Sequence, residues 1–205
     1  GALPARETAG PAAPPVPDWA RRKAPAVKRP PATLAPSDLG GAKALPGEAG
    51  LPEAEAKDRG TRLHLLLEHL PAVAREERAA VAPALLAPLT CHGDEVAEAC
   101  AVLDTPALAP LFAPDALAEV PVTAALPELG GRRLHGTIDR LRIEGETVWA
   151  VDFKTNAVVP DRPEDVPEGL LRQMGAYAAA LAQVWPGRRI ETALLWTRSA
   201  TLMPL

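Results

Sequence analysis

The sequence is poor in aromatic residues and cysteine, and it has no long apolar run. Aromatic residues make up 3% of the 205 positions, and there are two cysteines, Cys91 and Cys100. No apolar stretch approaches the ~18 residues that a transmembrane helix needs, and no signal-peptide pattern is visible. The cysteines lack companion ligands at close spacing, which argues against a zinc or iron–sulfur motif. We therefore expect free thiols in a reducing, cytoplasmic setting and no membrane contact.

Proline is concentrated at the beginning of the chain. Residues 1–50 contain ten prolines, with seven Lys/Arg and four Asp/Glu. Such a segment buries too little apolar surface to offset its ordering entropy, so we predict a mostly extended or disordered linker. The chain begins at Gly1 without an initiator methionine, and we expect it to be a piece of a longer polypeptide. Residues 51–205 have the length of one domain.

The net charge of −4 argues against a general polyanion binder, but the charge is unevenly distributed. Residues 51–131 carry five Lys/Arg and thirteen Asp/Glu, whereas residues 132–205 carry ten and nine. The second segment is therefore more basic than the first, which is compatible with a local anion-binding face.

Apolar periodicity predicts an α/β fold. Leucines at helical spacing predict a helix over Gly60–Leu70, in which His64 and Glu68 share a face. Extra helices are predicted between this helix and the first strand. The predicted core order is helix, three strands, helix and strand, which gives a mixed sheet flanked by helices. The other predicted elements are helices over Val73–Leu86, Gly93–Leu103, Thr105–Phe112 and Glu168–Trp185, and strands over Ala118–Ala124, Ile190–Thr197 and Ala200–Met203, beside a central hairpin.

The central hairpin carries an unusual charge arrangement. Its strands meet at a turn over residues 144–146, and this turn places Asp139 directly opposite Asp152. Opposed residues point to the same face about 5 Å apart, so two carboxylates there repel each other. Lys154 shares the face of Asp152, while Phe153 points to the core. A divalent metal ion would rationalise this arrangement.

The chemistry that this hairpin suits is phosphodiester hydrolysis. A divalent metal lowers the pKa of bound water and polarises a phosphoryl oxygen. Mg²⁺, or Mn²⁺ in its place, takes a few carboxylates and leaves positions for water and substrate oxygens. Asp139 and Asp152 supply such a partial shell, and the backbone carbonyl of Phe153 adds a ligand. Lys154 would orient the water or offset the charge of the phosphate.

These motifs resemble those of the PD-(D/E)XK nuclease superfamily, which has a restriction-endonuclease-like core. The residues flanking them are similar to the RecB-like branch, and in particular to the C-terminal nuclease domains of AddA-type helicase–nuclease subunits. The resemblance covers about residues 57–198. The matching stretches are Gly60-Thr61-Arg62-Leu63-His64, Gly136-Thr137-Ile138-Asp139, Val151-Asp152-Phe153-Lys154-Thr155-Asn156 and the Gln173-x-x-x-Tyr177 pair.

The resemblance also implies a role for each motif residue. Some relatives carry a four-cysteine iron–sulfur cluster, which two cysteines cannot provide, so no such cluster is expected. The implied roles are metal ligation for His64, Asp139 and Asp152, catalysis for the two aspartates with Lys154, and site support or DNA contact for Gln173, Tyr177 and Glu68.

The implied function is that of a Mg²⁺-dependent deoxyribonuclease acting as an exonuclease on single-stranded DNA. An ATP-binding helicase motor in the same polypeptide would supply the strands during recombinational double-strand-break repair in the nucleoid. The expected partner is an AddB-like subunit. Two alternatives remain at this point: a catalytically silent module that binds DNA or a partner subunit, and a stand-alone nuclease.

Four charged residues have open assignments. Glu68 is either a hydrogen-bond acceptor for a histidine or a solvated helix residue. Glu119, in the first strand, is a candidate for a further acidic position of the family. Arg140 and Arg172 are either phosphate contacts or members of surface salt bridges.

Overall fold

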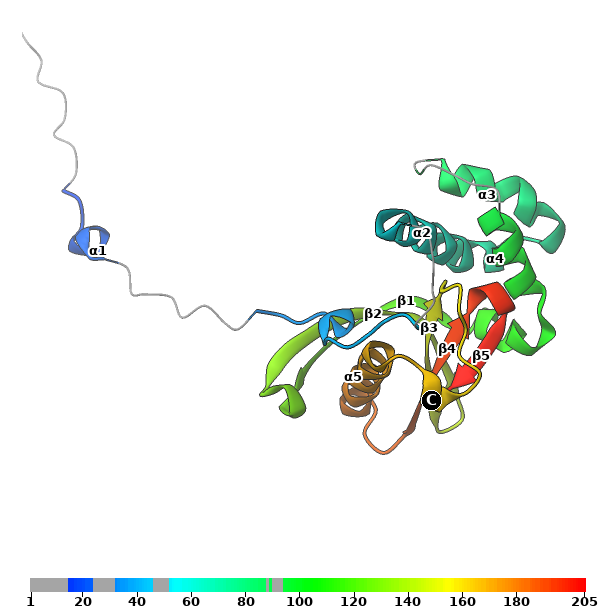
Figure 1. The fold of residues 1–205 in the computed structure, drawn as a ribbon. Helices are drawn as coiled ribbons and strands as arrows, with labels where there is room; N and C mark the ends of the chain where they lie inside the picture. The colour runs from blue at the N-terminus through cyan, green and yellow to red at the C-terminus, as the bar shows by residue number, and fades with distance from the viewer. Residues whose placement is uncertain (1–14, 24–31, 46–51, 88, 90–93) are drawn as a thin grey trace, which may run out of the picture. The chain divides into compact units, whose positions relative to one another are not determined.

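The fold is built on a five-stranded mixed sheet, as the sequence predicts (Figure 1). Spatial order follows chain order, and every neighbouring pair is antiparallel except β3 and β4, which are parallel. The computed structural model describes residues 15–23, 32–45, 52–87, 89 and 94–205. The strands are β1 (Leu117–Leu126), β2 (Arg132–Glu144), β3 (Thr147–Lys154), β4 (Arg189–Trp196) and β5 (Thr201–Pro204).

The register of the β2–β3 hairpin is the one predicted from its turn at Gly145, which has a left-handed φ of 56°. Paired residues run from the turn to Arg140 and Val151. Backbone pairing stops there, one position before Asp139 and Asp152. The two aspartates therefore lie where the strands have just ceased to be hydrogen-bonded partners.

Strands β1 and β2 are both irregular at this level. Glu119, which the register places opposite Asp139, has a φ of 48° and is omitted from an otherwise continuous ladder. In β2, Ile138 and Leu141 belong to the same core cluster, although regular alternation would put them on opposite faces. This local distortion frees the side chains of Glu119 and Asp139 from the usual sheet geometry.

Helices cover the two faces of the sheet (Figure 1). The helix α5 (Glu168–Val184) packs on one face, in a core that contains Met174, Ala180 and Leu181. The other face is covered by three helices whose buried residues form a second core with Phe153 of β3. These helices are α2 (Glu53–His69), α3 (Arg78–Leu86) and α4 (Asp94–Asp104).

Two predicted helices differ in detail from the observed elements. The stretch predicted as one helix from Val73 to Leu86 contains a 3₁₀ turn, Arg75–Glu77, before α3. The stretch Thr105–Phe112 forms a 3₁₀ helix, Pro106–Phe112, with Pro110 inside it. Prolines lack the N–H that a continued α-helix requires, which explains the tighter, shorter form.

The proline-rich start has two described parts. Residues 15–23 belong to a separate compact unit, Gly1–Pro30, and include the short helix α1 (Asp18–Arg21). Residues 32–45 belong to the unit that holds the sheet, where Leu34 forms a parallel bridge with Leu134. The packed part of the chain therefore begins inside the range 1–50 that the sequence predicts as linker.

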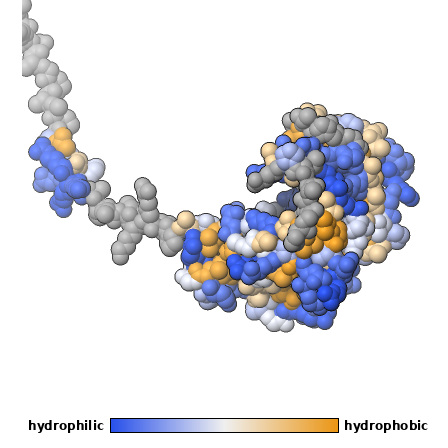
Figure 2. Space-filling model, viewed as in Figure 1, coloured by the Kyte–Doolittle hydropathy of each residue, from blue (hydrophilic) through white to orange (hydrophobic). Residues whose placement is uncertain are grey.

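On the face shown in Figure 2, hydrophilic residues cover much of the folded part, and hydrophobic residues gather in a few places between them. Among the described residues, none of the helices is both long and apolar enough to cross a lipid bilayer. Cys100 is a free thiol, and Cys91 lies outside the described residues.

Candidate active site

Helix α2 brings His64 to the level where the sheet is irregular. The leucine stripe of α2, which includes Leu63 and Leu67, is fully buried against the sheet, so His64 lies on the flank of the helix. Its Nδ1 atom is 3.2 Å from Oδ1 of Asp139, and its ring meets Phe153 edge-on at 5.5 Å between centroids. The predicted approach of His64 to the hairpin aspartates is therefore confirmed.

Two buried ion pairs fix α2 against α4. The guanidinium of Arg62 donates from Nε and Nη2 to Oε1 of Glu95, at 2.8 and 2.6 Å. One turn earlier, Arg59 pairs with Glu98 and also donates to the carbonyl of Thr155 at 3.5 Å. Because these charges are removed from water, both partners must stay paired. The pairs therefore hold the helix that presents His64.

Arg140 fixes the other end of α2. It is 4% exposed, donates from Nη2 to the carbonyl of Leu67 at 2.5 Å, and lies over the ring of Phe112 at 5.1 Å. A cation at the carboxyl end of a helix also suits the helix dipole. Both assignments considered for Arg140, a phosphate contact and a surface salt bridge, are wrong because the side chain is buried in a structural contact. Arg172 does form a salt bridge, with Glu168 at 2.7 Å.

An acidic cluster surrounds His64. His64, Glu119 and Asp139 each place one potential ligand atom within 4.8 Å of the other two. Partial burial raises the pKa of Glu119, and the charge of Asp139 raises it further. Burial lowers the pKa of His64, but its hydrogen bond to Asp139 and the surrounding carboxylates outweigh burial and leave it raised. Each group thus favours a bound proton where no cation balances the charge.

Asp152 is held by a second set of contacts on the same side of the hairpin. Its Oδ1 accepts a hydrogen bond from Nε2 of Gln173 at 2.7 Å, and its Oδ2 lies 2.5 Å from Nζ of Lys154. Lys154 also donates to Oε1 of Gln173 at 3.3 Å, which closes a three-residue ring of contacts. Burial raises the pKa of Asp152 to about 6, although the charge of Lys154 opposes this shift.

The carboxylate of Asp139 replaces the missing backbone pairing of the hairpin. Its Oδ2 accepts a hydrogen bond from the amide N–H of Phe153 at 2.5 Å, while its Oδ1 faces His64. This contact binds the two strands beyond the point where their ladder ends. It also answers the predicted charge problem, because the amide and the imidazole lie beside the carboxylate and Lys154 neutralises Asp152.

Tyr177 supports the strand rather than the carboxylates. Its hydroxyl donates to the carbonyl of Thr137 at 2.6 Å. Burial raises the pKa of this hydroxyl, and the charge of Asp152 raises it further, so it stays protonated as a donor. Tyr177 and Gln173 thus tie one face of α5 to β2 and β3, respectively.

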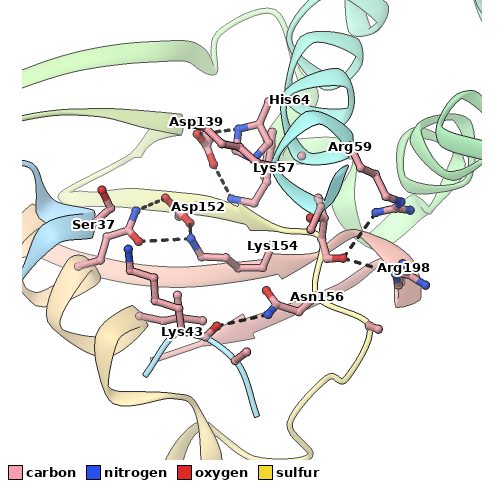
Figure 3. A pocket seen from close by; sticks show the side chains of 18 of the residues that line it. Ser37, Lys43, Lys57, Arg59, His64, Asp139, Asp152, Lys154, Asn156 and Arg198 are labelled. Carbon is pink, nitrogen blue, oxygen red and sulfur yellow. Dashed lines mark hydrogen bonds and ion pairs between the residues drawn. The ribbon is translucent and has the colours of Figure 1, made fainter. Parts of the chain in front are cut away.

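These groups open into a cavity of about 790 Å³ (Figure 3). Six of the predicted site residues line it, and Phe153 lines it as well. A smaller cavity of about 480 Å³, on the other side of His64, is lined by Glu68 and Glu119. The six residues are His64, Asp139, Asp152, Lys154, Gln173 and Tyr177.

Glu68 differs from its predicted neighbours. Its Oε2 lies 3.7 Å from Nε2 of His69, and it faces the smaller cavity rather than the main one. Its role as support for the site therefore stays a prediction, as does the use of the Phe153 carbonyl as a ligand.

Several lining residues lie outside the predicted set. The register of β1 against β2 was the one signal for Glu119, because it opposes Asp139. The others are basic or polar residues from segments without a motif pattern, and only the fold brings them here. They include Ser37, Lys43, Lys57, Arg59 and Arg198.

The donor set fits a divalent cation. One imidazole nitrogen and two carboxylates at mutual ligand distance leave room for water and substrate oxygens, as Mg²⁺ or Mn²⁺ requires. The structure adds Glu119 to His64 and Asp139, whereas Asp152 is engaged by Lys154 and Gln173.

The comparisons with known proteins agree with this geometry. A search of curated proteins finds no match to the chain. A family profile described as the PD-(D/E)XK nuclease superfamily matches residues 40–201, which is most of the sequence and includes every motif residue. The chain therefore belongs to the PD-(D/E)XK nuclease superfamily.

Proposed function

We propose that this domain hydrolyses the phosphodiester bonds of single-stranded DNA with Mg²⁺, or Mn²⁺ in its place. The observation that carries this proposal is the contact of His64 with Asp139 in a cavity that Asp152 and Lys154 also line. Three motifs from distant parts of the sequence converge there, with the residue types that phosphoryl transfer needs. Such convergence is not expected of residues that serve packing alone.

The residues divide the work between them. His64, Asp139 and Glu119 would hold the metal, with Asp152 beside them. When bound, the metal supplies Lewis-acid activation of the phosphoryl oxygen and a water of lowered pKa. Lys154, held by Asp152 and Gln173, stands ready to neutralise the phosphate and to orient the attacking water. Water attacks phosphorus, the bond to the 3′-oxygen breaks, and that oxygen takes up a proton.

We further propose that the domain serves an AddA-like helicase–nuclease in double-strand-break repair. Support comes from the RecB-like motifs and from the proline-rich segment, whose composition suits a tether. In this proposal an ATP-driven motor of the same polypeptide supplies single strands, an AddB-like subunit is the partner, and the enzyme works in the nucleoid.

A cleavage assay with matched variants tests the nuclease proposal. End-labelled single-stranded DNA is incubated with the protein in Mg²⁺, in Mn²⁺ and in EDTA. We expect metal-dependent products from the wild type, and none from Asp152→Ala or Lys154→Ala. Asp161→Ala, which removes an exposed carboxylate from a loop, is the control and should cleave normally.

Two outcomes would contradict the proposal. Cleavage that persists in EDTA or in Asp152→Ala would exclude the metal mechanism. If the wild type binds DNA but leaves it intact with either metal, the catalytically silent module is the better description.

A further inference from the structure

The main cavity has a wall that none of the nuclease motifs supplies. The segment Leu34–Ala44, here called the strap, runs along β2 and over the first turns of α5 (Figure 1). It contributes Ser37, Lys43 and Ala44 to the cavity lining. These residues come from the proline-rich region, far in sequence from the aspartates.

The strap is anchored along its length. At its start, the amide of Leu34 donates to the carbonyl of Arg133 at 2.9 Å, and the amide of His135 donates to the carbonyl of Leu34 at 2.9 Å. Further on, Nη1 of Arg172 donates to the carbonyl of Leu39 at 3.0 Å. These contacts fix the strap to β2 and to α5 without using any catalytic group.

Two motif-region glycines leave space for the strap. A Cβ at Gly136 would lie 2.7 Å from the ring of Pro36, and one at Gly169 would lie 2.6 Å from the carbonyl oxygen of Ala42. The amide of Gly169 donates to that carbonyl at 2.8 Å, which satisfies an N–H at the start of α5. The side chain of Asn156, at the end of the hairpin motif, donates to the carbonyl of Lys43 at 3.3 Å.

Lys43 is therefore a cation on a fixed backbone. Figure 3 shows its side chain pointing toward the side of the cavity where Asp152 and Lys154 lie. It is exposed, and among the described residues no carboxylate forms an ion pair with it. Lys154, by contrast, is engaged by Asp152 and Gln173. Lys43 is thus available for an anion that enters from outside.

We propose that Lys43 binds the backbone phosphate of the single strand next to the phosphate that is cleaved, so that the strap forms part of the substrate site. This inference rests on the proposed function, because it takes the strand in the cavity to be the nuclease's substrate. Lys43 positions the strand and takes no part in bond breaking. A phosphate contact of this kind carries no base preference.

Salt-dependent binding tests this role without cleavage. A 5′-fluorescein oligo-dT strand is titrated with protein in Ca²⁺ at several salt concentrations, and anisotropy gives the affinity. For Lys43→Ala we expect weaker binding and a slope of log affinity against log salt that is shallower by about 0.7, the value for one phosphate contact on a single strand. Lys43→Arg should keep the wild-type slope.

The control is Lys23→Ala, which removes the same charge from an exposed lysine that does not line the cavity. Thermal melting of each variant checks folding, and Lys43→Ala should melt as the wild type does. An unchanged slope and affinity in Lys43→Ala would overturn the inference, while normal Mg²⁺ cleavage would leave the nuclease proposal standing. If binding depends on Lys43 but the wild type does not cleave, the nuclease proposal fails and the contact remains.

Discussion

The Nδ1 atom of His64 lies 3.2 Å from Oδ1 of Asp139, and this contact joins helix α2 to strand β2 at the heart of the cavity. In the metal-free protein it favours a protonated imidazole, since the pKa of His64 is raised. A metal ion that binds these two residues must displace that proton. Stability and metal binding of the domain should therefore respond to pH in opposite directions.

Metal-free protein should lose stability as the pH rises through the raised pKa of His64. The contribution of the imidazolium is complete below the unfolded value of about 6.5 and is lost above the folded one. Thermal melting in EDTA between pH 6 and 8 measures this loss. His64→Gln should flatten the trend, and His69→Gln, which changes a more exposed histidine, should not.

Metal affinity should fall as the pH is lowered below about 6. The pKa of Asp152 is raised to about 6 by burial, so this carboxyl takes up a proton there and no longer offsets the metal's charge. We expect Mn²⁺ affinity to drop at least tenfold per pH unit below that value, measured by electron paramagnetic resonance of free Mn²⁺. Asp152→Asn should bind more weakly and show less pH dependence. A constant wild-type affinity from pH 5 to 7 would contradict this.

Replacing Glu119 with glycine should stabilise the metal-free domain and weaken its metal binding. The backbone of Glu119 has a left-handed φ of 48°, which glycine adopts without strain, and the change also removes a carboxylate beside Asp139. We expect a gain of about 1 kcal/mol in unfolding free energy in EDTA. Glu119→Gln, which keeps the strain and loses the charge, separates the two effects. Unchanged Mn²⁺ affinity in both variants would exclude Glu119 as a ligand.

Breaking the buried pair of Arg62 and Glu95 should be costly. Glu95 is 1% exposed, so Arg62→Ala leaves a buried charge without its partner and should cost about 3–5 kcal/mol in urea unfolding. The double change Arg62→Met with Glu95→Leu should recover most of this loss. Arg162→Ala breaks an exposed pair and should cost less than about 1 kcal/mol.

Gln173→Leu should reduce turnover more than DNA binding. Its amide orients both Asp152 and Lys154, and losing such a support typically costs about ten- to a hundredfold in activity. Single-turnover cleavage at saturating DNA measures the effect. The control is Gln183→Leu, in the same helix, whose side chain reaches only the carbonyl of Ala125. A change in DNA affinity with unchanged turnover would assign Gln173 to substrate binding.

The hairpin and its register were predictable because a tight turn fixes pairing locally. Gly145 sets the turn, and strand alternation then places Asp139 at the level of Asp152. The arrival of His64 was predictable only through the motif resemblance, since no local pattern relates it to the hairpin.

Other features required the fold itself. The burial of Arg140 depends on carbonyls at the end of α2 and on the ring of Phe112, which no short sequence pattern links to it. The left-handed backbone of Glu119 likewise leaves no trace in composition. The strap was predicted as linker because proline-rich sequence shows no apolar period, and its anchors are single contacts with distant glycines.

The strap has a practical consequence for where this nuclease can be cut out of its chain. A fragment beginning at residue 51 would keep every motif residue and still lose one side of its active site. Tyr177 would lose its proline neighbour near Gly136, and the first amide of α5 would lose its acceptor at Ala42. Fragments intended for biochemistry should therefore start before Leu34.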